Sequence, residues 1–297
     1  MRALQARTGH TTPLLQDVEE IPLGPHDVRI AVTAAAVNPA DIWVVGGQPR
    51  EIFGLPESVG LGYDLSGRVT AVGSAVRGFQ VDDTVAALHT DLAAPVRGQA
   101  EVATVPVSAV AHVPDGLDLA AVATVPLNAL TAAQALDLLG TPNGQSLLIT
   151  GAGGAVGGYA ITLAARSGWR VTALARTSDE EFVLRAGADQ LVTEIPGPHF
   201  DAVLDAAAMQ DAALTAARDR GLLVGVIPPM PITPERGIEV SAVKIRGDAT
   251  QLASLLRLTA EGELEIREAG RLPLSEAETA YAKVAAGGQR GRWLLLP

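Results

Sequence analysis

A glycine-rich segment in the middle of the chain has residue types and spacing that suit phosphate binding. Residues 147–158 read LLITGAGGAVGG, an apolar run that continues directly into a glycine-rich turn. Glycines let a backbone turn sharply and approach phosphate oxygens closely, because they have no Cβ atom. A helix that starts after such a turn points free N–H groups and its positive dipole end at the anion. The segment therefore predicts a turn that holds the pyrophosphate of a dinucleotide.

The sequence around this turn strengthens the prediction. A glycine-rich turn can serve helix packing alone, but here a second strand candidate, 170–175, follows about 25 residues later, which is the spacing of a βαβ unit. In that geometry Gly151 makes the turn and Gly157 lets helix and sheet pack closely, while the pyrophosphate lies on Gly153 and Gly154. The residues of this segment that we assign to the cofactor are Gly151, Gly153, Gly154, Ala155 and Val156.

The end of the second strand indicates which dinucleotide binds. Sites for NAD usually place Asp or Glu at this point to bond the ribose 2′-hydroxyl, whereas a cationic, hydroxyl-bearing loop accommodates a 2′-phosphate. Here Ala175 is followed by Arg176, Thr177 and Ser178, with no carboxylate at the tip. A guanidinium suits phosphate, so we expect Arg176 and Ser178 to favour NADPH over NADH. The alternatives are that Arg176 is a solvated surface charge and that Ser178 caps a helix together with Glu181.

The elements that would position these groups follow two patterns, and together they predict an α/β fold. Between Val28 and Val113, short Val/Ala-rich runs alternate with Gly, Pro and Asp turns, which is typical of an all-β or barrel-like module. From about Asp118, helical and strand segments alternate, as expected for βαβ units on a parallel sheet. The expected strands are 28–37, 64–72, 84–88, 101–106, 109–113, 146–150, 170–175, 190–193, 202–205, 221–227 and 239–245. The expected helices are 119–123, 129–139, 156–167, 179–186, 209–217 and 249–261.

Composition narrows the function classes. The chain has 297 residues, a formal net charge of −11 and no cysteine. The acidic balance argues against binding to nucleic acid or an anionic membrane surface, and the lack of cysteine excludes disulfides, thiolate metal ligands and a Cys nucleophile. The five histidines are scattered without a short-spaced pair, which argues against a catalytic zinc. With no apolar leader or membrane-spanning run, we expect an intracellular, cytoplasmic protein.

Several segments together resemble the medium-chain dehydrogenase/reductase superfamily, specifically its zinc-independent NADPH:quinone oxidoreductase-like branch. The resemblance runs nearly end to end. It is carried by AVNPAD at 36–41, GYDLSGRV at 62–69, VP at 125–126 with LTA at 130–132, the glycine turn, and GRWLLLP at 291–297. Any one of these segments is modest evidence, but their order and spacing are specific.

This resemblance implies a GroES-like β domain plus a doubly wound Rossmann domain. The GroES-like catalytic domain would comprise residues 1–117 and 264–297, so that the tail completes it, and the Rossmann NADPH-binding domain would comprise residues 118–263. The family also implies an active-site cleft between the domains and a homodimer.

The implied chemistry is hydride transfer without a metal. A quinone or an α,β-unsaturated carbonyl needs little electrophilic help, so the protein would mainly hold the acceptor against the nicotinamide and stabilise the developing oxyanion. By family position and side-chain chemistry, the candidate catalytic groups are Asn38, Tyr63 and Thr131. Tyr63 can equally be an aromatic wall against substrate, and Asn38 and Thr131 can also contact the nicotinamide or its ribose.

Three more residues complete the expected cofactor site. Val226 and Ile227 should follow a strand near the nicotinamide, where backbone groups can bond its carboxamide. Arg292 is cationic and could approach a cofactor phosphate, although a plain surface charge is an equal alternative. The leading hypothesis is an NADPH-dependent, zinc-free reductase of quinones or similar conjugated carbonyls. The alternatives are an enone or enoyl-thioester reductase, for example in secondary-metabolite tailoring, and a weakly catalytic NADPH-binding sensor.

Overall fold

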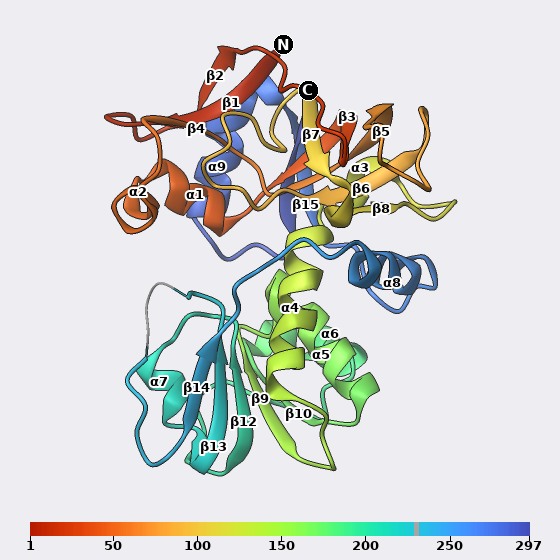
Figure 1. Ribbon diagram of the computed structural model, residues 1–297. Helices are drawn as coiled ribbons and strands as arrows, with labels where there is room; N and C mark the ends of the chain where they lie inside the picture. The colour runs from red at the N-terminus through yellow and green to blue at the C-terminus, as the bar shows by residue number, and fades with distance from the viewer. Residues whose placement is uncertain (229–231) are drawn as a thin grey trace. The chain divides into compact units, whose positions relative to one another are not determined.

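The fold was analysed in a computed structural model, which describes residues 1–228 and 232–297. The chain forms two compact units, and both chain termini belong to the same one (Figure 1). Unit 1 comprises Met1–Leu127 and Arg246–Pro297, and unit 2 comprises Asn128–Ile245.

Unit 2 is built on a six-stranded parallel sheet. Its strand order is β11-β10-β9-β12-β13-β14, so the first strand of the unit lies in the middle and the chain winds outward in both directions. This is the doubly wound order of a dinucleotide-binding domain, with its switch point between β9 and β12. The strands are β9 (Ser146–Thr150), β10 (Arg170–Leu174), β11 (Gln190–Val192), β12 (Phe200–Asp205), β13 (Ala217–Gly225) and β14 (Glu239–Ala242).

The helices of unit 2 follow the strands as the βαβ pattern requires. They are α5 (Ala155–Ser167), α6 (Glu180–Arg185) and α7 (Asp211–Leu214), with a 3₁₀ turn at Thr177–Asp179; α4 (Pro126–Leu139) runs from unit 1 into unit 2. The apolar strands β9, β10 and β12 have almost completely buried central residues. Such runs without alternation are typical of a parallel sheet covered on both faces.

Unit 1 is dominated by antiparallel pairing. A sheet of order β15-β16-β3-β5-β6-β8, with β7 also paired to β3, joins strands from both ends of the chain. These strands are β3 (Asp27–Val37), β5 (Asp64–Val72), β6 (Thr84–Leu88), β7 (Val102–Pro106), β8 (Val110–His112), β15 (Glu268–Pro273) and β16 (Arg292–Leu296). A second sheet of order β2-β1-β4 contains β1 (Arg2–Arg7), β2 (Leu14–Asp17) and β4 (Ser58–Gly60).

The tail completes unit 1 as the resemblance implied. β16 pairs antiparallel with β3 in the register Trp293–Val37, and the helix α9 (Ala277–Ala285) packs against β16. The helices of this unit are α1 (Pro39–Val45), α2 (Gln48–Phe53), α3 (Leu119–Val122), α8 (Ala249–Ala260) and α9 (Ala277–Ala285). One apolar core lies under β3, β5 and β6, and a second joins β1, α1 and α9.

The boundaries between the units differ from the expected ones. The units divide after Leu127 and Ile245, whereas the sequence pattern suggested a first boundary at about 118 and the family resemblance a second one after 263. The reason is packing: α3 contacts β3 and β5, and α8 contacts β8, so both helices belong to the β-rich unit despite their helical sequence pattern.

One expected helix is largely absent. Residues 209–217 were expected to be helical, but α7 covers only Asp211–Leu214, and β13 already begins at Ala217. After Ala217, the first part of β13 is the charged stretch Arg218–Arg220, which lies before the expected start of this strand at residue 221. It is held in place by side-chain bonds, such as that from Arg218 to Asp201 at 2.8 Å.

Candidate functional site

The glycine-rich turn lies at the carboxyl end of β9, at the switch point of the sheet in unit 2. Gly151 has φ +59°, in the left-handed region, and a Cβ atom there would lie 3.0 Å from the Cβ of Ala207. At Gly157 a Cβ atom would lie 2.4 Å from the carbonyl oxygen of Gly151, so this position is closed to any side chain. The two glycines therefore hold the tight join of strand, turn and helix that was expected of them.

The start of α5 has the form of an anion site. Gly154 precedes the helix, and Ala155 is its buried first residue. A Cβ atom at Gly154 would contact only the carbonyl oxygen of Gly151, at 3.0 Å, so the outer side of this residue is open. Val156 follows in the first turn, where N–H groups have no partner four residues earlier within the helix. The residues of the turn thus fit a dinucleotide pyrophosphate.

At Gly153 the structure adds a feature that the sequence did not reveal. A Cβ atom at this position would lie 2.6 Å from Oδ2 of Asp179, so the carboxylate of Asp179 packs directly against the glycine. Asp179 is 2% exposed, and its Oδ2 lies 3.2 Å from Nε of Arg176. The absence of a side chain at Gly153 is therefore required by Asp179 as well as by any bound phosphate.

Arg176 is paired with Asp179 but remains accessible to solvent. It follows β10, and its side chain is 59% exposed although Nε is held by Asp179. Ser178 lies in the 3₁₀ turn Thr177–Asp179, and α6 begins only at Glu180, after Asp179. Asp179, not Ser178, is thus the residue that precedes α6, and both roles expected of Ser178 stay predictions.

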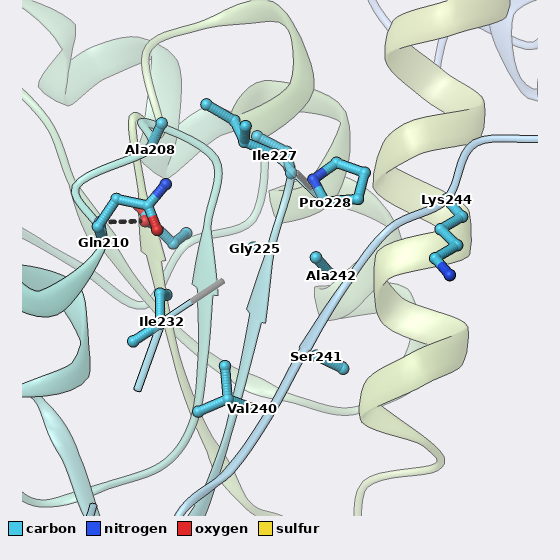
Figure 2. Close-up of a pocket in the computed structure, with 12 residues that line it drawn as sticks. Ala208, Gln210, Gly225, Ile227, Pro228, Ile232, Val240, Ser241, Ala242 and Lys244 are labelled. Carbon is cyan, nitrogen blue, oxygen red and sulfur yellow. Dashed lines mark hydrogen bonds between the residues drawn. The ribbon is translucent and has the colours of Figure 1, made fainter. Parts of the chain in front are cut away.

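A cavity of about 230 Å³ opens at the carboxyl ends of β13 and β14 in unit 2. Figure 2 shows Gln210 and Ala208 on one side of it, Ala242 on the other, and Ile227 along its upper edge. Val226 and Ile227, which were expected near the nicotinamide, both line it. The cavity is lined by Asp205, Ala208, Gln210, Gly225, Val226, Ile227, Pro228, Ile232, Val240, Ser241, Ala242 and Lys244.

A buried carboxylate ties this cavity to the glycine turn. Asp205 at the end of β12 accepts a hydrogen bond of 2.6 Å from the hydroxyl of Thr150, the residue before the turn. It also accepts the backbone N–H groups of Met209 and Gln210, at 3.0 and 2.8 Å. Gln210 has φ +57°, so Asp205 stabilises a loop conformation that an unanchored chain would rarely adopt.

Unit 1 contains a second cluster of buried polar groups, at the ends of β3 and β5. Asn38 is 1% exposed, its Nδ2 donates to Oδ2 of Asp64 at 2.6 Å, and its Oδ1 accepts from Nε of Arg292 at 2.8 Å. The backbone N–H of Leu127 also donates to Asp64. Arg292 is therefore not an isolated surface charge, and Asn38 links a carboxylate to a guanidinium.

The two carboxylates of this cluster are fully enclosed. Asp41 accepts backbone N–H groups from Asn38 at 2.9 Å and Gly62 at 3.0 Å. Burial raises the pKa of Asp41 to about 6 and that of Asp64 to about 7, although these hydrogen bonds oppose the rise. Buried carboxyls that titrate near neutrality are typical of functional sites.

Tyr63 lies beside this cluster, under an arginine that sequence reasoning missed. The guanidinium carbon of Arg97 lies 4.4 Å from the centroid of the Tyr63 ring. The side chain of Arg97 is 0% exposed, and its Nη2 lies 3.8 Å from Oδ1 of Asp41. Burial raises the pKa of Tyr63, while the charge of Arg97 opposes the rise. Only the burial of a cation could have singled out Arg97, and burial is not visible in its loop sequence.

The expected site residues fall into two groups. Asn38, Tyr63 and Arg292 belong to unit 1, whereas Thr131, the glycine turn, Arg176, Ser178, Val226 and Ile227 belong to unit 2. Thr131 lies in α4 and is 8% exposed. Sequence reasoning did not identify Asp41, Arg97 or Asp179 as site residues. Asp179 could have been found as the first carboxylate after β10.

Residues 1–228 and 232–297 contain no group of three or more His, Asp or Glu side chains that could hold a metal ion. Within the same residues, none of the helices combines the length and apolar character needed to cross a membrane.

Comparison with known families agrees with this architecture. The model described as "Alcohol dehydrogenase GroES-like domain" matches residues 24–115, and the model described as "Zinc-binding dehydrogenase" matches residues 178–295. Among solved structures, a quinone oxidoreductase from Coxiella burnetii superposes with a TM-score of 0.86 at 26% identity, covering 100% of this chain and 99% of that one.

Two curated relatives extend the comparison. The chloroplast envelope quinone oxidoreductase homolog of Arabidopsis thaliana is 28% identical, and the match covers 92% of this chain and 90% of the relative. A mycocerosic acid synthase-like polyketide synthase of Mycobacterium tuberculosis is 28% identical over 93% of this chain, which spans only 14% of that protein. Proteins of this kind bind a nicotinamide cofactor. The chain is an oxidoreductase of the medium-chain dehydrogenase/reductase superfamily and belongs to its quinone oxidoreductase-like branch.

Proposed function

We propose that the protein is an NADPH-dependent, zinc-independent reductase that transfers hydride to a quinone or a similar conjugated carbonyl compound. The observation that carries the choice of NADPH is the position of Arg176. Its guanidinium follows β10, is held through Nε beside the glycine turn, and exposes 59% of its side chain to a ligand. An accessible guanidinium at this point suits the 2′-phosphate of NADPH.

The cofactor would be held by unit 2. Backbone groups of Gly153, Gly154, Ala155 and Val156 would bind the pyrophosphate, because the start of a helix offers free N–H groups to an anion. The cavity beside Val226 and Ile227 would receive the nicotinamide, which supplies hydride when bound. The loop held by Asp205 would keep the wall of this cavity in place.

Unit 1 would stabilise the oxygen that becomes negative when the acceptor is reduced. Tyr63 carries the hydroxyl best suited to donate a hydrogen bond or a proton, and Thr131 in unit 2 offers a second hydroxyl. The side chain of Asn38 bonds both Asp64 and Arg292, which supports a role in fixing these two groups. Whether Asn38 also donates to substrate, and whether Arg292 approaches the cofactor, stay predictions.

Zinc independence rests on donor chemistry. The chain has no cysteine, and the part of it that the structure describes contains no cluster of three His or carboxylate ligands. These residues do not fit the tetrahedral N/S sites that catalytic zinc requires. Activity that survives exhaustive treatment with a chelator would support the proposal, and loss that only Zn²⁺ restores would contradict it.

We also propose a homodimer. Among the described residues, the end strand β14 of the unit 2 sheet pairs with one neighbour, β13, and its residues alternate between exposed and half-buried. An open strand edge of this kind can pair with another chain. Light scattering that gives the mass of two chains would support this arrangement, and the mass of one chain at high concentration would contradict it.

A second candidate function is favoured by one comparison. Polyketide synthases from four organisms match this chain, among them one from Saccharopolyspora erythraea at 37% identity over 58% of the chain. Such matches favour an enone or enoyl-thioester as the acceptor, with the same cofactor and the same hydride chemistry. A third candidate, a weakly catalytic NADPH-binding sensor, has the same cofactor site.

An acceptor panel separates these candidates. Oxidation of NADPH, followed by its absorbance, is measured with 1,4-naphthoquinone, cyclohexenone and a crotonyl thioester. Turnover of the quinone is expected, and Tyr63→Phe should slow it. Turnover of the thioester alone would replace the quinone assignment by the second candidate. Tight NADPH binding without turnover of any acceptor would favour the sensor.

A further inference from the structure

Arg97 is a buried cation whose two terminal guanidinium nitrogens lack well-formed hydrogen bonds. Its Nε donates to the carbonyl oxygen of Gly60 at 2.9 Å. Its Nη1 and Nη2 are enclosed and make no hydrogen bond of normal geometry within the described residues, although a weaker interaction with the Tyr63 side chain helps to lower the pKa of that phenol. A guanidinium usually remains in a protein interior only when its charge is well paired, since burying an unpaired charge is costly.

The nearest carboxylate does not satisfy this charge. Oδ1 of Asp41 lies 3.8 Å from Nη2 of Arg97, too far for a hydrogen bond, and the same carboxylate already accepts two backbone N–H groups. Its pKa is raised to about 6 by burial, so its negative charge is itself disfavoured there. An apolar side chain of similar length would pack in this place without the electrostatic cost.

Arg97 also faces the aromatic ring of Tyr63. The guanidinium lies over the face of the phenol ring, 4.4 Å from its centroid, in a cation–π arrangement. The backbone carbonyl of Tyr63 also accepts the N–H of His89, at 2.7 Å, which fixes the chain on its other side. A fixed positive charge in this position stabilises a phenolate far more than a neutral phenol.

We propose that Arg97 is a positioning residue that prepares Tyr63 to give up its proton during substrate reduction. This inference rests on the proposed function and deepens it. After hydride reaches the conjugated carbonyl compound, the acceptor oxygen carries the negative charge. The O–H bond of Tyr63 breaks, its proton forms a new O–H bond on the acceptor, and the electron pair stays on Tyr63 as phenolate. A proton from water then restores the phenol.

Other titratable groups around Tyr63 act differently from Arg97. The negative charge of Asp41 raises the pKa of Tyr63, and so opposes phenolate formation. His89 stays neutral near pH 7, because burial and the charge of Arg97 lower its pKa to about 4. Tyr281 is buried, and its hydroxyl donates to Gln99 at 2.7 Å. Arg97 is thus the cation that favours the phenolate.

The test compares Arg97→Met with Arg97→Lys, which keeps a positive charge. Tyrosinate formation is followed by ultraviolet absorbance across alkaline pH, and subtraction of the Tyr63→Phe spectrum isolates the Tyr63 step. Because Arg97 also lowers the pKa of Tyr281, the double variant Tyr63→Phe/Arg97→Met is needed to remove that contribution. Arg257→Met, a surface change on α8, controls for the loss of one charge from the chain.

Arg97→Met should move the Tyr63 titration to higher pH, while Arg97→Lys and Arg257→Met should leave it nearer to that of the original protein. With NADPH and an acceptor that turns over, kcat should fall about 10² to 10⁴-fold in Arg97→Met, the usual size of a lost proton-transfer contribution. Arg97→Lys should recover part of this loss.

An unchanged Tyr63 titration in both Arg97 variants would overturn the proposal. The titration needs no turnover, so it is independent of the proposed function. If the titration shifts but Tyr63→Phe reduces acceptors at the full rate, Tyr63 is not the proton donor and this role of Arg97 is refuted. If Arg97→Met does not fold, Arg97→Gln, which also removes the positive charge, takes its place, and an unchanged Tyr63 titration in that variant overturns the proposal.

Discussion

Replacement of Arg176 by Ala tests the cofactor choice. The side chain is 59% exposed, and Nε is held by Asp179. The variant therefore loses the hydrogen bonds that Nη1 and Nη2 would donate to a 2′-phosphate. A hydrogen bond to a charged group contributes about 1.5–3 kcal/mol, and solvent screening at an exposed site favours the lower end of this range. At 1.4 kcal/mol for each factor of ten, Kd for NADPH should rise about 10-fold.

The assay is a fluorescence titration with NADPH and, in parallel, with NADH, which has no 2′-phosphate. Kd for NADH should change by less than about 2-fold, since a group that is absent cannot lose a contact. Arg185→Ala is a matched control, because Arg185 lies on α6 of the same unit and is 58% exposed. The difference between the two dinucleotides should shrink at high salt. Equal weakening of NADPH and NADH binding by Arg176→Ala would refute the reasoning.

Two further predictions concern stability. Gly157→Ala places a Cβ atom 2.4 Å from the carbonyl oxygen of Gly151 and should lower the free energy of unfolding, measured in urea, by about 1–3 kcal/mol. The control is Gly197→Ala, whose Cβ atom meets no atom within 4 Å and should leave this free energy unchanged. Equal stabilities of the two variants would contradict the packing argument. Because burial raises the pKa of Asp64 from 3.8 to about 7, its contribution to stability is complete below pH 3.8 and is lost as the pH rises to about 7. Asp64→Asn should therefore flatten the fall in the free energy of unfolding over this pH range. Asp201 behaves in the opposite way: its pKa is lowered, so its contribution to stability is lost as the pH falls. A dependence of the unfolding free energy on pH that Asp64→Asn leaves unchanged would refute the assignment.

Much of the fold could be predicted from local sequence because several elements have strong local signals. β9 and β5 begin and end where the apolar runs predicted, and α5 starts one residue before the expected position. The short strands β1, β2 and β4 were not predicted. They pair with strands far away in the sequence, as Gln5 does with Gly60, and a run of three to six residues contains no local signal for such a partner.

The candidate site was predictable only in part. The glycine turn and Arg176 are contiguous with the strands that position them, so the sequence pattern contained their geometry. Arg97 and Asp179 depend on burial and on tertiary neighbours, Tyr63 in one case and Gly153 in the other. A charged residue in a loop sequence is ordinarily a solvated one, and only the folded chain shows that these two are enclosed.

The most direct test of the central claim uses NADPH deuterated at C4 of the nicotinamide, on the face from which hydride leaves. With a conjugated enone as acceptor, the account predicts a slower kcat/KM than with unlabelled NADPH, and deuterium at a carbon atom of the reduced product, detected by mass spectrometry and NMR. Turnover that leaves the product unlabelled would contradict hydride transfer from NADPH to the acceptor.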